Sequence, residues 1–164
     1  MSMLKKMPRN NTDNQTPAPQ TSLRQPLFCY GTLQLPAVLE AVIGRRLQGV
    51  RAALAGYGVF RIRRAEYPGL LRLPGQIAWG LLYDDLSPAE LGILDRFEGV
   101  QYERRAQAVQ RIDGRRVQAW VYMVAAGRRR QLTAVPWRLQ RFRRSAYRRF
   151  MKRFVTDRRF LYEP

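Results

Sequence analysis

Apolar side chains in the first part of the sequence change from strand-like to helix-like spacing. A short apolar run at 27–30 ends in a Gly-Thr step, as expected of a buried strand that enters a loop. Residues 36–43 then place apolar side chains at helical spacing, with Pro36 suited to the first turn and Gly44 to the C-terminal stop. The pattern therefore predicts a strand followed directly by a helix.

The next part of the chain has the pattern of strands interrupted by glycines. Its apolar stretches lie at 49–62, 67–73 and 76–86. Pro74-Gly75 separates the last two stretches, and this dipeptide is typical of a turn. We therefore expect three strands here, the last two joined by a turn.

A second helix is predicted over 87–98, where the sequence marks both its start and its end. Ser87 suits the N-cap, Pro88 the first helical position and Glu90 the acid of a capping box. Gly99 is expected to supply a left-handed C-terminal stop. One face of this helix is apolar and carries Leu91, Leu94 and Phe97.

Two further strands and a last helix complete the expected order. Stretches 104–112 and 115–124 flank Asp113-Gly114, which is a strong signal for a hairpin with a two-residue loop. From Pro136 the chain has a helical pattern, with arginines opposite an apolar stripe of Leu139, Phe142, Ala146, Tyr147, Phe150, Met151 and Phe154. Mixed strands and helices around one sheet predict an α+β fold with a curved or barrel-like sheet.

Composition divides the chain into three expected parts. Residues 1–26 include a polar stretch that cannot bury enough apolar area to offset its ordering entropy, so we expect a flexible segment and order from Leu27. The domain is expected at 27–126, with 127–164 as a basic helical extension packed on it. No apolar run is long enough to cross a bilayer, and the N-terminus lacks the apolar stretch of a signal peptide. The simplest expectation is a cytoplasmic protein.

The residue types that the chain lacks narrow its chemistry. It has no histidine, which removes Ser-His-Asp and Cys-His nucleophiles and most histidine metal sites. Its single cysteine, Cys29, excludes an internal disulfide framework and a cysteine-cluster zinc site, and we expect it to be a small hydrophobe buried in a strand. A proton carrier would have to be Glu, Asp, Lys or Tyr.

The formal charge of +18 is concentrated towards the C-terminal end. Residues 127–164 carry 13 basic and two acidic side chains, net +11, whereas 27–126 carry a net charge of only +4. Such a segment favours nucleic acid, an anionic membrane or an acidic partner. A solvated helix face gives the same pattern, and so does an amphipathic helix at 136–154 lying on a membrane surface.

Glu98 occupies an electrostatically unfavourable position at the C-terminal end of the second helix. The helix dipole, Asp95 one turn earlier and the apolar neighbours Leu94, Phe97 and Val100 would all raise its pKa towards the range useful for proton transfer near neutral pH. The stretch alone also permits an exposed Glu98 that pairs with Arg104 or Arg105. A second candidate, the Tyr-Gly-Thr turn at 30–32, exposes backbone N–H groups that can hold a carboxylate or an oxyanion, although many such turns serve only to cap a helix.

Four stretches, which together cover roughly residues 27–124 or about 60% of the chain, are YGTLQLPAVL, GYGVFRIRRAEYPGLL, LSPAELGILDRFEGVQYERR and DGRRVQAWVYMV. Taken together, these stretches resemble the γ-glutamylcyclotransferase-like family, also called the avirulence-induced-gene-like family. YGTL and LDxFEGxxYxR in this order are far more specific than either motif alone. The resemblance implies a small mixed-strand β-barrel flanked by short helices.

The resemblance also implies roles for particular residues. Glu98 would be the catalytic glutamate, and Tyr102 and the Tyr67-Pro68 step would shape the pocket. The backbone of the substrate-binding loop would hold the glutamyl carboxylate or carbonyl, and this loop consists of Tyr30, Gly31, Thr32 and Leu33.

The leading hypothesis is an enzyme of the acyltransferase or lyase type that releases 5-oxoproline and a free amine from a small γ-glutamyl amine or peptide. The substrate's own α-amine attacks its γ-carbonyl, so no enzyme nucleophile, metal or cofactor is needed. The rival hypothesis is a non-catalytic binding protein on the same fold, whose basic C-terminal helix contacts nucleic acid or another anionic partner. The sequence predicts neither the leaving amine nor an oligomeric state.

Overall fold

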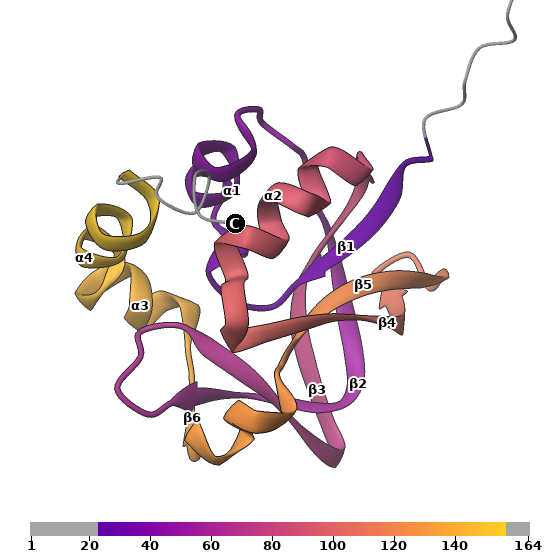
Figure 1. Ribbon diagram of the computed structural model, residues 1–164. Helices are drawn as coiled ribbons and strands as arrows, with labels where there is room; N and C mark the ends of the chain where they lie inside the picture. Colours follow the sequence, from indigo (N-terminus) through magenta and orange to yellow (C-terminus); the bar gives the residue numbers. More distant parts are fainter. Residues whose placement is uncertain (1–22, 157–164) are drawn as a thin grey trace, which may run out of the picture.

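The computed structural model describes residues 23–156, and a small closed β-barrel lies at its centre (Figure 1). Five strands follow one another in the order β3–β1–β5–β4–β2, and β2 pairs back to β3 to close the ring. β1 and β5 are parallel, whereas the other pairs are antiparallel. The strands are β1 (Gln25–Cys29), β2 (Val50–Ile62), β3 (Pro68–Leu86), β4 (Tyr102–Arg111), β5 (Arg116–Val124) and β6 (Leu132–Pro136). The expected α+β fold with a mixed-strand barrel is confirmed.

Short helices flank the barrel in two groups (Figure 1). α1 and α2 contact each other beside β1, while α3 and α4 lie together further along the same side of the molecule. The α-helices are α1 (Pro36–Ile43), α2 (Pro88–Glu98), α3 (Leu139–Ser145) and α4 (Tyr147–Phe150). Turns of 3₁₀-helix occur at η1 (Thr32–Gln34), η2 (Gly99–Gln101) and η3 (Ala126–Gln131), and α4 continues into a π-helical turn, η4 (Met151–Thr156).

Two hydrophobic cores result, and β1 contributes to both. Successive side chains of a strand point to opposite faces. Leu27 and Cys29 therefore pack among the helices, in the same cluster as Phe142 and Phe150. Phe28 and Tyr30 point the other way, into the barrel. The end of β1 consequently lies where the two cores meet.

The turn expected at Pro74-Gly75 is wrong, because these residues lie inside β3. Ala55 pairs with Ile77 and Tyr57 with Arg72, so residues 73–76 have no partner across from Gly56 in β2. Gly75 has a φ of +84°, which glycine adopts without strain. The dipeptide thus forms an irregular bulge within one 19-residue strand. Bulges bend and twist a strand, which suits a sheet that closes on itself.

The predicted start of α2 is confirmed, and its end differs in detail. The Ser87 side chain accepts from Glu90 N–H, and the Glu90 carboxylate accepts from Ser87 N–H, so the capping box is complete. Gly99 has a positive φ of 58° but an extended ψ of −155°, so the chain continues through the 3₁₀ turn η2 into β4 instead of making a left-handed stop. The predicted hairpin is also present, but its loop is longer than two residues: Arg111 N–H bonds to Arg115 C=O across residues 112–114.

The segment after residue 126 is less uniformly helical than expected. β6 pairs with the end of β2, and the helical stretch changes direction at Ala146, where α3 ends and α4 begins. At the other end of the chain, β1 begins at Gln25, two residues before the expected start of order. The expectations for residues 1–22 and 157–164 lie outside the described residues. Within residues 23–156, no helix has both the length and the apolar character to span a membrane, and the cytoplasmic location stays a prediction.

Candidate active site

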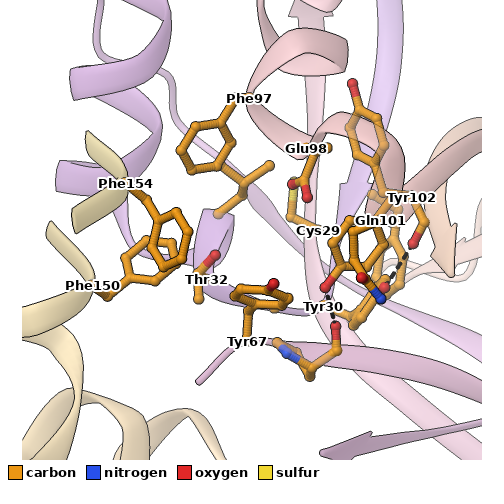
Figure 2. Close-up of a pocket in the computed structure, with 15 residues that line it drawn as sticks. Cys29, Tyr30, Thr32, Tyr67, Phe97, Glu98, Gln101, Tyr102, Phe150 and Phe154 are labelled. Carbon is orange, nitrogen blue, oxygen red and sulfur yellow. Dashed lines mark hydrogen bonds between the residues drawn. The ribbon is translucent and has the colours of Figure 1, made fainter. Parts of the chain in front are cut away.

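A pocket of about 110 Å³ opens where the two cores meet, at the end of β1. Ligand pockets for drug-sized molecules measure roughly 300–1,000 Å³, so this cavity suits a small group. All eight residues to which the resemblance assigns a role line it, although they come from three separate parts of the chain (Figure 2). They are Tyr30, Gly31, Thr32, Leu33, Tyr67, Pro68, Glu98 and Tyr102.

Glu98 lies at the last position of α2 and extends its carboxyl into the pocket (Figure 2). The residue keeps some exposed surface towards the pocket, but protein atoms enclose the carboxyl group. This burial raises the pKa of Glu98 to about 8, and the nearby Asp95 carboxylate adds to the rise. A carboxyl with such a pKa exchanges its proton near neutral pH, as a general acid or base must.

The alternative of a surface ion pair for Glu98 is wrong. Arg104 pairs with Asp95, with 3.0 Å between Nε and Oδ1. Arg105 pairs with Glu103, with 2.6 Å between Nη2 and Oε2. Among residues 23–156, Glu98 forms no ion pair. The surroundings expected from the sequence need one correction, because Val100 is 78% exposed and does not enclose the carboxyl.

The turn after β1 places backbone groups beside Glu98. Thr32 is buried, and it begins the 3₁₀ turn η1. The N–H groups of Gln34 and Leu35 bond back to the C=O groups of Gly31 and Thr32, which fixes the shape of the turn. A side chain at Gly31 would place its Cβ 3.0 Å from Pro68, so the turn and the start of β3 approach closely at this point.

Three tyrosines brace the pocket through their hydroxyl groups. Tyr30 donates to the C=O of Tyr122 at 2.6 Å, and Tyr102 donates to the C=O of Pro68 at 2.5 Å. Tyr122 donates to the Asp95 carboxylate at 2.8 Å. These bonds link the residue after β1 to β5, β5 to α2, and β4 to β3 around the cavity. Each hydroxyl proton is thereby committed to a protein acceptor.

The sequence did not single out several residues that line the pocket. Cys29 is buried in β1 as expected, and it also lies beside Glu98 (Figure 2). Gln101 follows Glu98 by three residues, within the LDxFEGxxYxR motif but at one of its unspecified positions. The others are Phe28, Phe97, Tyr122, Phe150 and Phe154, whose patterns indicated only core or motif positions.

The C-terminal helices supply an aromatic wall to this pocket. The ring centroid of Phe154 lies 5.2 Å from that of Phe150 and 5.7 Å from that of Tyr67. Phe150 in turn contacts the ring of Phe97 on α2, at 6.4 Å. Since Phe142 and Phe150 are buried, the apolar stripe faces the protein, which contradicts the alternative of a helix lying on a membrane surface.

No metal site accompanies the pocket within residues 23–156, where no three Cys, Asp or Glu side chains gather as ligands. The acid in the pocket, Glu98, has only Cys29 and tyrosines as titratable neighbours along the lining.

The barrel with this pocket has the fold of γ-glutamyl cyclotransferases. A solved structure named Gamma-glutamyl cyclotransferase matches 62% of this chain and 66% of its own, with a TM-score of 0.55 and 16% identity. Residues 27–143 match the family described as "Gamma-glutamyl cyclotransferase, AIG2-like", and the chain belongs to this family.

Plant proteins are among its relatives. AIG2-like protein C of Arabidopsis thaliana is 35% identical over 92 residues, which are 53% of this chain and 51% of that protein. The chain thus spans about half the length of the curated relatives it matches. The solution structure of another Arabidopsis thaliana protein has a TM-score of 0.62 at 24% identity, covering 85% of this chain and 94% of its own.

Proposed function

We propose that the protein is a cyclotransferase that converts a small γ-glutamyl amine or peptide into 5-oxoproline and a free amine. One observation carries the proposal above all others: an enclosed glutamate without an ion pair among residues 23–156, in a small pocket beside the turn after β1. Membership of the γ-glutamyl cyclotransferase family suggests the reaction in which this carboxyl would transfer protons.

The reaction forms one bond and breaks another within a single substrate. The α-amine attacks the γ-carbonyl carbon, a five-membered ring closes, and the amide bond to the leaving nitrogen breaks. The α-ammonium nitrogen must lose one proton before it attacks and a second as it becomes the ring amide. The leaving nitrogen must gain one proton to depart as an amine, and the remaining proton goes to solvent or to the released amine. A bent substrate held in a small pocket has its reacting atoms close together, which removes most of the entropic cost of ring closure.

Glu98 carries the proton in this scheme. Its carboxylate accepts a proton from the α-ammonium group, and the resulting carboxylic acid donates one to the leaving nitrogen. A pKa of about 8 makes both forms accessible near neutral pH. The backbone N–H groups of 30–33 face the developing oxyanion in this proposal, and Tyr67 and Tyr102 shape the space around the substrate.

Release of 5-oxoproline from γ-glutamyl amino acids, γ-glutamyl amines and glutathione tests the proposal. We expect the wild-type protein to release it from at least one substrate, and Glu98→Gln to lower kcat by about 10²-fold to 10⁴-fold. Glu103→Gln is a matched control, because Glu103 is an exposed acid outside the pocket that pairs with Arg105. No release across the panel, or full turnover by Glu98→Gln, would contradict the proposal.

A second candidate function rests on the outer face of the C-terminal helices. Eight cationic side chains between residues 138 and 153 are exposed. Of these eight, only Arg149 forms an ion pair with a described residue, and its partner is Glu66. We propose this surface as a site for nucleic acid or another anionic partner, beside or in place of catalysis. The exposed cations are Arg138, Arg141, Arg143, Arg144, Arg148, Arg149, Lys152 and Arg153.

A further inference from the structure

Gln101 has an unusual side chain for an enclosed position. Of the buried side-chain nitrogen and oxygen atoms in residues 23–156, only Nε2 of Gln101 lacks a hydrogen-bond partner. Burying an amide donor without an acceptor costs free energy, so proteins rarely keep one without a use. Gln101 lines the pocket, where a ligand can supply the missing acceptor.

The backbone around Gln101 is fixed, so the amide is held in place. Gln101 ends the 3₁₀ turn η2, and its backbone carbonyl accepts from Ala125 N–H at 2.9 Å. In the pocket, Gln101 lies with Tyr30 and Tyr102, on the opposite side from Phe150 and Phe154 (Figure 2). Glu98 lies between these two sides in the same view. A ligand atom that reaches Gln101 therefore lies away from the aromatic wall.

The side-chain donors that line the pocket are neutral. Among residues 23–156, no lysine or arginine lines the cavity. The hydroxyl protons of Tyr30, Tyr102 and Tyr122 already bond to protein acceptors. A negatively charged group of a ligand consequently depends on neutral donors, and the amide of Gln101 is a side-chain donor without a protein acceptor.

We propose that Nε2 of Gln101 donates a hydrogen bond to the α-carboxylate of the glutamyl group. The inference rests on the proposed function for the identity of the ligand, and it deepens that function by adding a substrate-binding residue. A carboxylate is a stronger acceptor than an amide carbonyl, since hydrogen bonds to charged groups are the stronger ones. The same carboxylate remains in the product, 5-oxoproline.

A neutral donor also protects the proton carrier. An arginine at this position would bind the carboxylate more strongly, but its charge would lower the pKa of the neighbouring Glu98. Gln101 instead binds an anion without placing a positive charge in the cavity. The raised pKa of Glu98 and an anionic substrate are therefore compatible in one small pocket.

Binding of 5-oxoproline and of its carboxamide, 5-oxoprolinamide, tests the inference without any turnover. Gln101→Met keeps the length of the side chain and removes the donor. We expect it to weaken 5-oxoproline binding by about tenfold or more, because a hydrogen bond to a charged group is lost. Binding of the carboxamide should be weaker in the wild type and should change little in the variant. Gln118→Met, at an exposed position of β5, is the matched control and should change neither.

Thermal unfolding of Gln101→Met accompanies the titrations, and we expect a melting temperature no lower than that of the wild type, since the variant removes an unsatisfied donor. A second variant, Gln101→Glu, should abolish 5-oxoproline binding through repulsion between carboxylates. The inference is overturned if Gln101→Met binds 5-oxoproline like the wild type, if both ligands weaken equally, or if the wild type binds neither.

These outcomes are separate from those that decide catalysis. A protein that binds 5-oxoproline through Gln101 but releases none from any γ-glutamyl substrate retains this inference and loses the proposed function. If 5-oxoproline release depends on Glu98 but the KM of Gln101→Met equals that of the wild type, the proposed function is retained and this inference is lost.

Discussion

Asp95 and Glu98 lie one turn apart on α2, yet of these two acids only Asp95 pairs with an arginine of the described residues. Its carboxylate contacts Nε of Arg104 at 3.0 Å and accepts from the Tyr122 hydroxyl at 2.8 Å. Glu98 turns instead into the pocket, where burial and the charge of Asp95 raise its pKa. One short stretch of helix thus provides an acid paired with an arginine outside the pocket lining and a second acid, Glu98, that lines the pocket.

The pH dependence of catalysis should respond to Asp95. Glu98 must be ionised to accept a proton, so we expect kcat/KM to rise with pH towards about 8. Asp95→Asn removes a negative charge that raises the pKa of Glu98, and should move this rise to lower pH, by on the order of one pH unit. The pH profile of 5-oxoproline release measures the change. Glu103→Gln should not change the pH at which kcat/KM rises. If Asp95→Asn does not change it either, the rise of kcat/KM with pH does not report the ionisation of Glu98.

Stability should also depend on the protonation of Glu98. Its pKa is about 8 in the folded protein and near 4.5 when unfolded, so the folded state binds the proton more tightly. The protein therefore loses stability as pH rises from about 4.5 to about 8. Glu98→Gln, which cannot ionise, should be more stable than the wild type at pH 8 by roughly 1–3 kcal/mol, and nearly equal at pH 4.5. Urea unfolding at both pH values checks this, and a variant no more stable at pH 8 would show that the carboxyl is not held in an enclosed site.

The aromatic wall should influence the choice of leaving amine. Phe154 lies across the pocket from Gln101 and touches Tyr67 and Phe150 (Figure 2). We expect Phe154→Ala to change the KM values of substrates with different leaving amines by several-fold, and to leave 5-oxoproline binding nearly unchanged. Steady-state kinetics on a substrate series give the first result and titration gives the second. If Phe154→Ala changes the KM values of all these substrates equally, the aromatic wall does not contact the leaving amine.

Binding of an anionic polymer should depend on the outer arginines. Replacing Arg143, Arg144 and Arg148 by Gln removes three exposed charges from α3 and α4. If single-stranded nucleic acid binds here, the slope of log K against log salt should decrease by about two, at roughly 0.7 per lost phosphate contact. The matched control replaces Arg72, Arg96 and Arg116, which are exposed elsewhere on the molecule. Equal losses in both triple variants would indicate only the general charge of the protein.

Local sequence was sufficient where neighbouring residues determine the structure. The capping box of Ser87 and Glu90 involves residues three positions apart, and it formed as predicted. Pro74-Gly75 failed as a turn because β2 pairs with β3 on both sides of the dipeptide, and this long-range pairing holds the strand together. A local preference was overridden by contacts that no short window contains.

The site was predictable to a similar extent. The family motifs identified eight residues, and all eight line one pocket, although their roles stay predictions. Phe150 and Phe154 were missed because an apolar helical stripe has the same pattern whether it fills a core or lines a cavity. Gln101 was missed because its amide lacks a hydrogen-bond partner only as a result of which residues surround it in the fold, and the sequence alone does not contain this information.

The match to the family ends at residue 143, but the pocket does not. Phe150 and Phe154 complete it from beyond that point, on a short helical segment that rests against the barrel without belonging to it. A relative can therefore retain the same scaffold and the same glutamate while carrying a different cover over them. Grafting that cover from one member onto another would be a direct way to transfer a preference for a particular amine.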